Sequence, residues 1–353
     1  MELIPSLPHD LGLECLIRLP HNAFPSAASV CRSWRSEIHR PSFRNHRKSA
    51  GFTRRIVVMV QARVDDSNRS HGLRKYSVAP VYRLTVYEPE AGKWSELPPV
   101  PGFSGGLPLF CQIAPVGFSL VVMGGLNREN WNASNFVFVY NFLSATWRRG
   151  PDMPGCTRSF FGCASDNDRR VFVAGGHDNE KNALRSGMMY DVAEDEWTTL
   201  PDMAYERDEC KGVFHRGKLY VIGGYDTLRQ GQFGKSTEVL DPLTLQWDPV
   251  RDDFLVADTC PRTCVDGGNK VMYMYRDGAV VALDHSSMTR IPDDMNSVAC
   301  MVECGGQLLA VGSDGFGGGH GVCLLDLESS TWIKTDTPEE FSGHIQSGCC
   351  LEV

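Results

Sequence analysis

The 353-residue chain contains no apolar run that approaches the roughly 20 residues of a membrane-spanning helix. Its first residues lack the charged-then-apolar pattern of a secretory signal. It also lacks a glycine-rich loop ending in Lys-Ser/Thr and any recognisable Ser/His/Asp motif. These absences predict a protein without a membrane partner, located in the cytoplasm, the nucleus or both, that is not itself an enzyme.

A metal-binding cysteine pattern is missing too. The thirteen cysteines are odd in number and scattered, and several stand inside apolar runs, as buried reduced thiols of an intracellular protein do. Cys260-x₃-Cys264 and Cys300-x₃-Cys304 are spaced more widely than usual zinc ligands, and no paired histidines accompany them. We therefore expect neither a metal nor another cofactor.

Negative charge predominates, but it is unevenly distributed. The net charge of −8 divides into +5 for residues 1–55, which hold nine Lys/Arg and four Asp/Glu, and −13 for the remainder. Such an asymmetry indicates two modules with different partners. The acidic remainder argues against general nucleic-acid binding, which requires a basic face.

What the sequence does contain is a repeat of about 50 residues. An apolar residue stands seven places before a tryptophan five times, in the pairs Tyr87 and Trp94, Tyr140 and Trp147, Tyr190 and Trp197, Leu240 and Trp247, and Leu325 and Trp332. The first four tryptophans are 53, 50 and 50 residues apart, and double glycines precede several of them. This period with these marks is the kelch signature of a β-propeller. The alternative is a β-sandwich in which the tryptophan spacing is fortuitous. The residues expected to carry the repeat are Gly124, Gly125, Trp147, Gly175, Gly176, Trp197, Gly223, Gly224, Trp247 and Trp332.

Counting the repeats predicts six blades, with five or seven as alternatives because the fifth unit has Arg290 in place of tryptophan. Blades two to four are expected over 104–151, 155–201 and 207–250. The first blade begins at its second strand, near Arg54, and no first strand precedes it. The last residues, 344–351, resemble the first-strand segment 158–164, so we expect the C-terminal strand to complete the first blade and remove an open sheet edge.

The N-terminal stretch predicts two or three short helices. About forty residues are too few to bury a stable core alone, and apolar residues lie all round them, so a partner must cover some. The strings Leu7-Pro8-x-Asp10-Leu11, Leu19-Pro20, Val30-Cys31-Arg32-x-Trp34-Arg35 and Pro41-x-Phe43 resemble an F-box, although Gly12 departs from the pattern. F-box proteins are substrate receptors of SCF ubiquitin ligases. The resemblance implies a Skp-type adaptor and, through it, a cullin.

The fold expected is thus mainly β, a six-bladed kelch β-propeller with a small N-terminal α-helical F-box. The expected domains are an F-box at 1–45, a basic linker at 46–53 and the propeller at 54–353. The linker is interpreted as a solvated helix end facing an acidic adaptor or the propeller rim, with a nuclear-localisation signal as the alternative. The residues expected to contact the adaptor are Leu7, Pro8, Leu11, Leu16, Pro20, Val30 and Trp34.

In kelch propellers, targets usually dock on the loops after the second strand and before the first. The residues expected there are Asn127, Arg128, Arg158, His177, Asp178, Arg207, Tyr225, Asp226 and Arg262. Arginine and tyrosine are enriched at binding hot spots, and arginines round a central pocket would suit a carboxylate-bearing segment. A rival interpretation is a kelch scaffold or metal-dependent kelch enzyme in which the N-terminal helices only cap the ring.

Over nearly its whole length the chain resembles one plant F-box/kelch subgroup, the KISS ME DEADLY-like proteins. Stretches that carry this resemblance include 106–111, 159–166, 206–211, 231–233 and 351–353. The subgroup includes receptors that direct phenylalanine ammonia-lyase, an enzyme of phenylpropanoid metabolism, to degradation, and receptors of type-B response regulators in cytokinin signalling. The resemblance implies these two protein classes as candidate targets.

Overall fold

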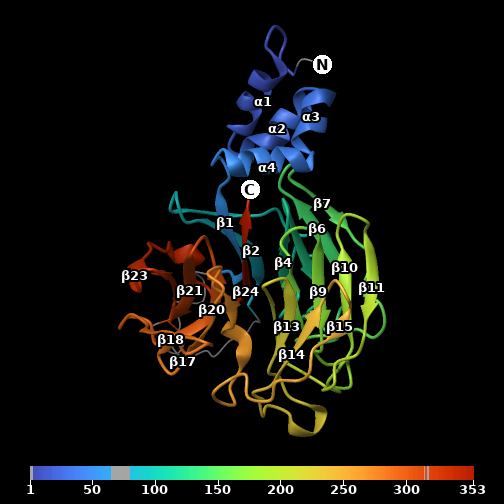
Figure 1. Ribbon diagram of the computed structural model, residues 1–353, viewed down its shortest axis with the longest axis vertical. Helices are drawn as coiled ribbons and strands as arrows, with labels where there is room; N and C mark the ends of the chain where they lie inside the picture. Colours follow the sequence, from blue (N-terminus) through green and yellow to red (C-terminus); the bar gives the residue numbers. More distant parts are fainter. Residues whose placement is uncertain (1–2, 65–79, 314, 316–317) are drawn as a thin grey trace.

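Six four-stranded antiparallel sheets pack in a ring. A helical module stands on one end of this ring (Figure 1). The computed structural model describes residues 3–64, 80–313, 315 and 318–353. The expected six-bladed propeller with N-terminal helices is confirmed.

Prolines, and the extended backbone at one cysteine, divide the helical module into short helices. The helices are α1 (His9–Ile17), η1 (His21–Ala23), α2 (Phe24–Val30), α3 (Arg32–Ile38) and α4 (Pro41–Ser49). Pro25 and Pro41 lie in the first turns of α2 and α4, where the missing N–H costs nothing. Cys31 separates α2 from α3 with an extended backbone, and its Sγ accepts the N–H of Trp34 at 3.5 Å. Residues 46–49 belong to α4, so the first half of the linker expected at 46–53 is helical.

The blades follow one another along the chain. Blade one contains β24 (Ile345–Glu352), β1 (Arg55–Ala62), β2 (Tyr82–Glu88) and β3 (Lys93–Glu96). Blade two contains β4 (Gln112–Val116), β5 (Ser119–Met123), β6 (Val137–Asn141) and β7 (Thr146–Arg149). Blade three contains β8 (Gly162–Ser165), β9 (Arg170–Ala174), β10 (Gly187–Asp191) and β11 (Glu196–Leu200).

The second half of the ring is built in the same way. Blade four contains β12 (Lys211–His215), β13 (Lys218–Ile222), β14 (Thr237–Asp241) and β15 (Gln246–Trp247). Blade five contains β16 (Val265–Asp266), β17 (Met272–Arg276), β18 (Ala279–Ala282) and β19 (Met288–Arg290). Blade six contains β20 (Ser297–Glu303), β21 (Gln307–Ser313), β22 (His320–Asp326) and β23 (Thr331–Lys334). Short 3₁₀ turns lie at Thr227–Arg229 (η3), Pro261–Thr263 (η4) and Glu339–Phe341 (η5).

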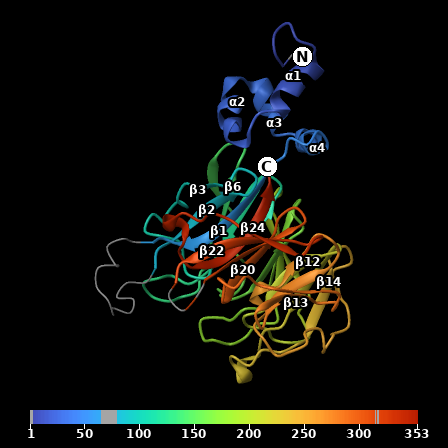
Figure 2. The same ribbon diagram turned by 90° about the vertical axis from the view of Figure 1, so that its left-hand side faces the viewer.

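The two ends of the propeller segment are joined in blade one. Strand β24 pairs antiparallel with β1 from Arg55 opposite Glu352 to Gln61 opposite Ile345. Beyond the strand, Arg54 and Val353 exchange both backbone hydrogen bonds, at 2.7 and 2.8 Å. Both views show β24 beside β1, with the C-terminus emerging under the helices (Figure 2). The expected closure by the C-terminal strand is therefore confirmed.

Each repeat tryptophan links its blade to the preceding one. The residue seven places earlier lies directly opposite it across the third and fourth strands, as Tyr190 does to Trp197. The indole N–H then reaches a backbone carbonyl of the neighbouring blade, at 2.9 Å from Trp197 to Pro151 and 2.8 Å from Trp247 to Pro201. The spacing thus reflects a cross-strand pair and an interblade hydrogen bond made in the same way around the ring.

The second glycine of each double glycine permits close contact with the backbone that precedes the first strand of the same blade. Gly176 has φ +83°, and a Cβ there would lie 2.4 Å from the carbonyl oxygen of Ser159. Gly224 has the same φ, and its Cβ would lie 2.6 Å from the carbonyl oxygen of Asp208. Only glycine fits both the conformation and the space.

The helical module packs on the propeller through side chains from the turns of blade two. Leu143 belongs to the same buried cluster as Leu16, Phe24 and Phe43, and Phe118 packs against that cluster. Lys48 bonds Glu352 at 2.7 Å. The helices therefore rest on the end of the ring that carries the turns between first and second strands.

Candidate functional site

The outer part of the helical module exposes apolar side chains. Leu11 in α1 is 49% exposed and Val30 at the end of α2 is 63% exposed. Pro8 and Pro20 are also exposed, whereas Leu7 is half-buried. We call these accessible apolar residues of the module together the helical hook surface: Leu7, Pro8, Leu11, Pro20 and Val30.

Two residues expected at the adaptor contact have other roles. Leu16 is 1% exposed and lies in the core of the module, so its side chain cannot meet a partner in this conformation. The expectation for Leu16 is corrected: it lies on the inner face of α1 together with Gly12 and Ile17. Trp34 is half-buried, packs against the same core and donates its indole N–H to the carbonyl of Leu3 at 2.6 Å.

Arg47 shows that the basic stretch is only partly solvated. It is fully buried; its guanidinium donates to the carbonyls of Ile17, Leu19 and Phe52, and it lies 4.7 Å from the ring centre of Phe24. Burial lowers the pKa of Arg47 to about 10. This side chain therefore ties α1, α4 and the following segment together, which charge composition alone does not reveal. Its neighbours Arg44, Lys48 and Arg54 do face the propeller rim, pairing with Asp168, Glu352 and Glu90.

The loops after second strands and before first strands lie at the end of the ring opposite the helices (Figure 1), because antiparallel strands alternate in direction. We call this end the target face. Two arginines expected there as contact residues are instead buried, each 2% exposed. Arg158 donates to the carbonyls of Gly175 and Ser186, both at 3.1 Å. Arg207 donates to the carbonyl of Gly223 at 2.7 Å and pairs with Glu238 at 3.1 Å.

The expectation for Arg158 and Arg207 is therefore corrected. Each arginine bonds the carbonyls at both ends of the loop between the second and third strands of its blade: Gly175 and Ser186 for Arg158, Gly223 and Ser236 for Arg207. It thereby holds the two ends of that loop together. The residue type and loop position agreed with a binding role, but burial excludes it.

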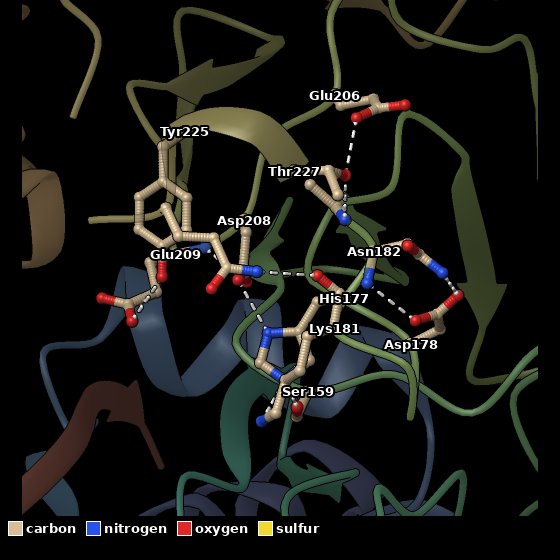
Figure 3. Close-up of polar contacts among 12 residues, drawn as sticks. Ser159, His177, Asp178, Lys181, Asn182, Glu206, Asp208, Glu209, Tyr225 and Thr227 are labelled. Carbon is tan, nitrogen blue, oxygen red and sulfur yellow. Dashed lines mark hydrogen bonds and ion pairs between the residues drawn. The ribbon is translucent and has the colours of Figure 1, made fainter. Parts of the chain in front are cut away.

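His177 is also buried, and it stands in an arrangement that the sequence motifs did not reveal. Its Nδ1 lies 2.7 Å from Oδ2 of Asp208, and its Nε2 lies 2.8 Å from Oγ of Ser159 (Figure 3). The three residues are far apart in sequence, which is why no Ser/His/Asp motif was recognisable. The expectation that His177 is a contact residue is corrected, because its side chain is buried.

The three residues of this Ser-His-Asp group are hydrogen-bonded in the same order as in a hydrolase triad, but a substrate has no access to the serine. Ser159 is 0% exposed, and its N–H and carbonyl are both bonded to the backbone of His177. Lys181 Nζ lies 3.1 Å from the same Nε2. No substrate carbonyl can reach Oγ, since nucleophilic catalysis needs contact distance. The group instead fastens the loops of blade three to Asp208 at the start of blade four.

The other expected target-face residues mostly shape their own loops. Asn127 and Asp178 accept backbone N–H groups two to four residues ahead. Asp226 caps η3 through the N–H groups of Leu228 and Arg229. Arg128 donates to the carbonyl of Gly105 at 3.1 Å. These side chains are at least partly accessible, so a partner could still meet them.

Arg262 lines the mouth of the channel at the centre of the ring, and Tyr225 bonds Glu209 of the same lining. The hydroxyl of Tyr225 donates to Glu209 at 2.9 Å, and burial followed by the charges of Asp208 and Glu209 raises the pKa of Tyr225 (Figure 3). Arg262 is exposed and lines a cavity of about 120 Å³ at the channel mouth. Three other residues of that cavity, Phe110, Phe160 and Lys211, were not expected as contact residues, although each lies in a stretch that carries the family resemblance.

No cluster of three or more His, Cys, Asp or Glu side chains suited to a metal occurs within residues 3–64, 80–313, 315 and 318–353. Cys264 and Cys300 are buried, and burial raises the pKa of both thiols. Among the described helices, none is long and apolar enough to cross a membrane.

Comparison with known proteins matches both modules. The F-box domain model matches residues 4–46, and the Kelch motif model matches residues 116–154, 157–204 and 206–252. F-box/kelch-repeat protein At1g80440 of Arabidopsis thaliana is 47% identical over 363 residues, with 100% of both chains covered. The chain belongs to the plant F-box/kelch-repeat protein family. F-box/kelch-repeat protein At1g15670 of the same plant is 45% identical, again over 100% of both chains.

A solved structure shares the fold over most of the chain. The chain described as "Structure of YjhT" matches with a TM-score of 0.57 and 13% identity, covering 72% of this chain and 91% of the other. At this identity the similarity concerns the fold. In F-box/kelch terms, the helical hook surface lies on the F-box, and the target face lies at the far end of the kelch propeller.

Proposed function

We propose that this F-box/kelch protein is the substrate-recognition subunit of an SCF-type ubiquitin ligase. Its F-box would bind a Skp-type adaptor, and through it a cullin, while the kelch propeller holds the protein to be ubiquitinated and degraded. The protein would act in the cytosol, the nucleus or both. Its contribution is proximity: the ligase brings the charged ubiquitin carrier and the target together, and no bond is made by this chain.

The observation that carries this proposal is the exposed apolar surface of the F-box. Leu11 and Val30 remain exposed although the module already has a core of its own around Phe24 and Phe43. Apolar side chains left exposed on a small module that already has a core suit a contact with a partner. The same surface disfavours the rival in which the helices only cap the ring, because the cap contact is made by other residues, around Phe118 and Leu143.

Substitution at this surface tests the proposal. Val30→Asp and Leu11→Asp should each reduce co-purification with a Skp-type adaptor at least tenfold, since a charge would be buried without a partner. Leu228→Asp is the matched control, because Leu228 is 95% exposed on the target face. Full adaptor binding by both F-box variants would refute the receptor proposal.

For the target, we propose phenylalanine ammonia-lyase or a type-B response regulator, following the subgroup that the chain resembles. A ligase reconstituted with this chain should ubiquitinate one of the two and not bovine serum albumin. Modification of neither, with adaptor binding intact, would reject both targets while leaving the receptor function standing.

A further inference from the structure

The mouth of the central channel on the target face holds a small pocket with aromatic walls and cationic side chains. Its volume is about 120 Å³, and its lining includes Phe110, Phe160, Glu209, Lys211 and Arg262. A drug-sized ligand or cofactor needs roughly 300 Å³ or more. The pocket is therefore of a size for one side chain of a docked protein.

Three residues of the lining are held in an unusual backbone conformation. Phe110, Phe160 and Glu209 have φ of 59°, 55° and 51° and precede the first strands of blades two, three and four. Bulky residues rarely adopt this region, and such outliers cluster at functional sites. The segment before each is fixed by a reciprocal pair of backbone hydrogen bonds, as between Asp208 and Tyr225 at 2.8 and 3.0 Å.

This conformation places the two phenylalanine rings together. The ring centres of Phe110 and Phe160 are 4.5 Å apart, and Phe160 stacks on His177 at 5.4 Å. His177 is itself fixed by Ser159 and Asp208. The buried Ser-His-Asp group therefore supports one wall of the pocket.

The charges in the pocket do not balance. Across the described part of the chain, neither the ammonium of Lys211 nor the guanidinium of Arg262 has a hydrogen-bond or ion-pair partner, whereas Glu209 is bonded by Tyr225 at 2.9 Å. His344, also in the lining, has its pKa lowered to about 4 by loss of hydration and then by His320 and Arg262, so it is neutral at pH 7. Two cations and one anion leave a positive pocket.

We propose that this pocket receives a single carboxylate side chain, Asp or Glu, of the target protein. The carboxylate would lie between Lys211 and Arg262, and its methylene groups would lie against Phe110 and Phe160. Water-excluding aromatic walls strengthen such a charge pair. This inference rests on the proposed receptor function and assigns the anchoring role to Lys211 and Arg262, in place of the buried Arg158 and Arg207.

The test is selection of a displayed random heptapeptide library against the full chain in complex with its Skp-type adaptor. The selected peptides should share an Asp or Glu at one position, and replacing it by the amide should weaken binding at least tenfold. Lys211→Met and Arg262→Gln should each lower the affinity of the acidic peptide to that of the amide peptide. Arg251→Gln, an exposed arginine outside the pocket, should have no effect.

Three outcomes would each overturn the inference: no peptide is selected, the selected peptides share no carboxylate, or neither pocket variant changes the binding. Thermal unfolding shows whether each variant is folded. Because Arg262 is exposed, Arg262→Gln should fold and remain informative even if Lys211→Met does not fold. Adaptor binding in the same preparation separates the two ideas: its loss rejects the receptor function, and its retention with no carboxylate preference rejects the pocket alone.

Discussion

Arg207 is enclosed by the groups that it bonds. Its guanidinium meets Glu238, the carbonyls of Gly223 and Ser236, and the hydroxyl of Ser236, and Glu238 is only 1% exposed. Glu238 in turn accepts the N–H groups of Ala204 and Tyr205. The pair therefore joins the loop before blade four to the sheet of that blade. It stabilises the fold because each charged group gives the other a partner in the protein interior.

Arg207→Ala should lower the free energy of unfolding by about 3–5 kcal/mol, because it leaves the carboxylate of Glu238 buried without its cation. Urea denaturation followed by circular dichroism measures this. Arg229→Ala, at an arginine exposed on the same face, should change stability by less than about 0.5 kcal/mol. A similarly small loss for Arg207→Ala would contradict the structural role.

His344 makes stability depend on pH. Its ring packs edge-on against Tyr82 and His320, and loss of hydration, His320 and Arg262 lower its pKa from 6.5 to about 4. The unfolded chain thus binds the proton more readily than the folded one. Stability should be full above pH 6.5 and should fall as the pH drops towards 4. His344→Gln should reduce the drop in urea midpoint between pH 7 and pH 4.5. An unchanged pH profile in this variant, compared with His285→Gln as control, would assign the effect elsewhere.

Among the elements, β24 closes the ring by pairing with β1. It supplies the first strand of blade one, and a Cβ at the preceding Gly343 would lie 1.9 Å from the carbonyl oxygen of Ala62. Both β24 and Gly343, which precedes it, therefore pack closely against β1.

Deleting Ile345–Val353 should leave β1 with an open edge and yield aggregated protein on size-exclusion chromatography. Gly343→Ala should give a folded but weaker protein, with unfolding free energy lower by about 1–3 kcal/mol because the backbone must shift. Gly321→Ala, where no atom lies within 4 Å of the added Cβ, is the matched control. A monomeric, cooperatively unfolding deletion variant would show that the ring does not need this closure.

The elements that the sequence predicted well are those defined by repetition. Seven-residue spacing to tryptophan follows from a cross-strand pair that recurs in five blades, and the missing first strand near Arg54 required a partner from the other end of the chain. The site was predicted less well, because burial is a property of the assembled ring. Arg158 and Arg262 look alike in sequence, yet one bonds backbone carbonyls in the interior and the other lines an open pocket. Likewise, Ser159 and His177 meet only when the two loops of blade three come together, and Asp208 reaches His177 from the start of blade four.

At the scale of the whole molecule, the helical hook surface and the target face lie at opposite ends (Figure 1). The F-box nevertheless does not swing freely, since Leu143 and Phe118 of blade two enter its core and Lys48 bonds the closing strand. On the proposed function, adaptor and target would therefore be held in a fixed relative orientation. For ubiquitin transfer, orientation contributes as well as proximity.

Loosening this junction should separate binding from transfer. Phe118→Ser combined with Leu143→Ser removes the apolar contact of blade two with the F-box but touches neither the helical hook surface nor the target-face pocket. Adaptor affinity and acidic-peptide affinity should each stay within about twofold, while the initial rate of target ubiquitination in the reconstituted ligase should fall several-fold, because the target lysines spend less time near the ubiquitin carrier. Leu243→Ser, at a leucine 88% exposed on blade four, controls for loss of apolar surface alone. An unchanged transfer rate in the double variant would mean that the F-box acts as a flexible tether, and that the packing of Leu143 and Phe118 serves stability only.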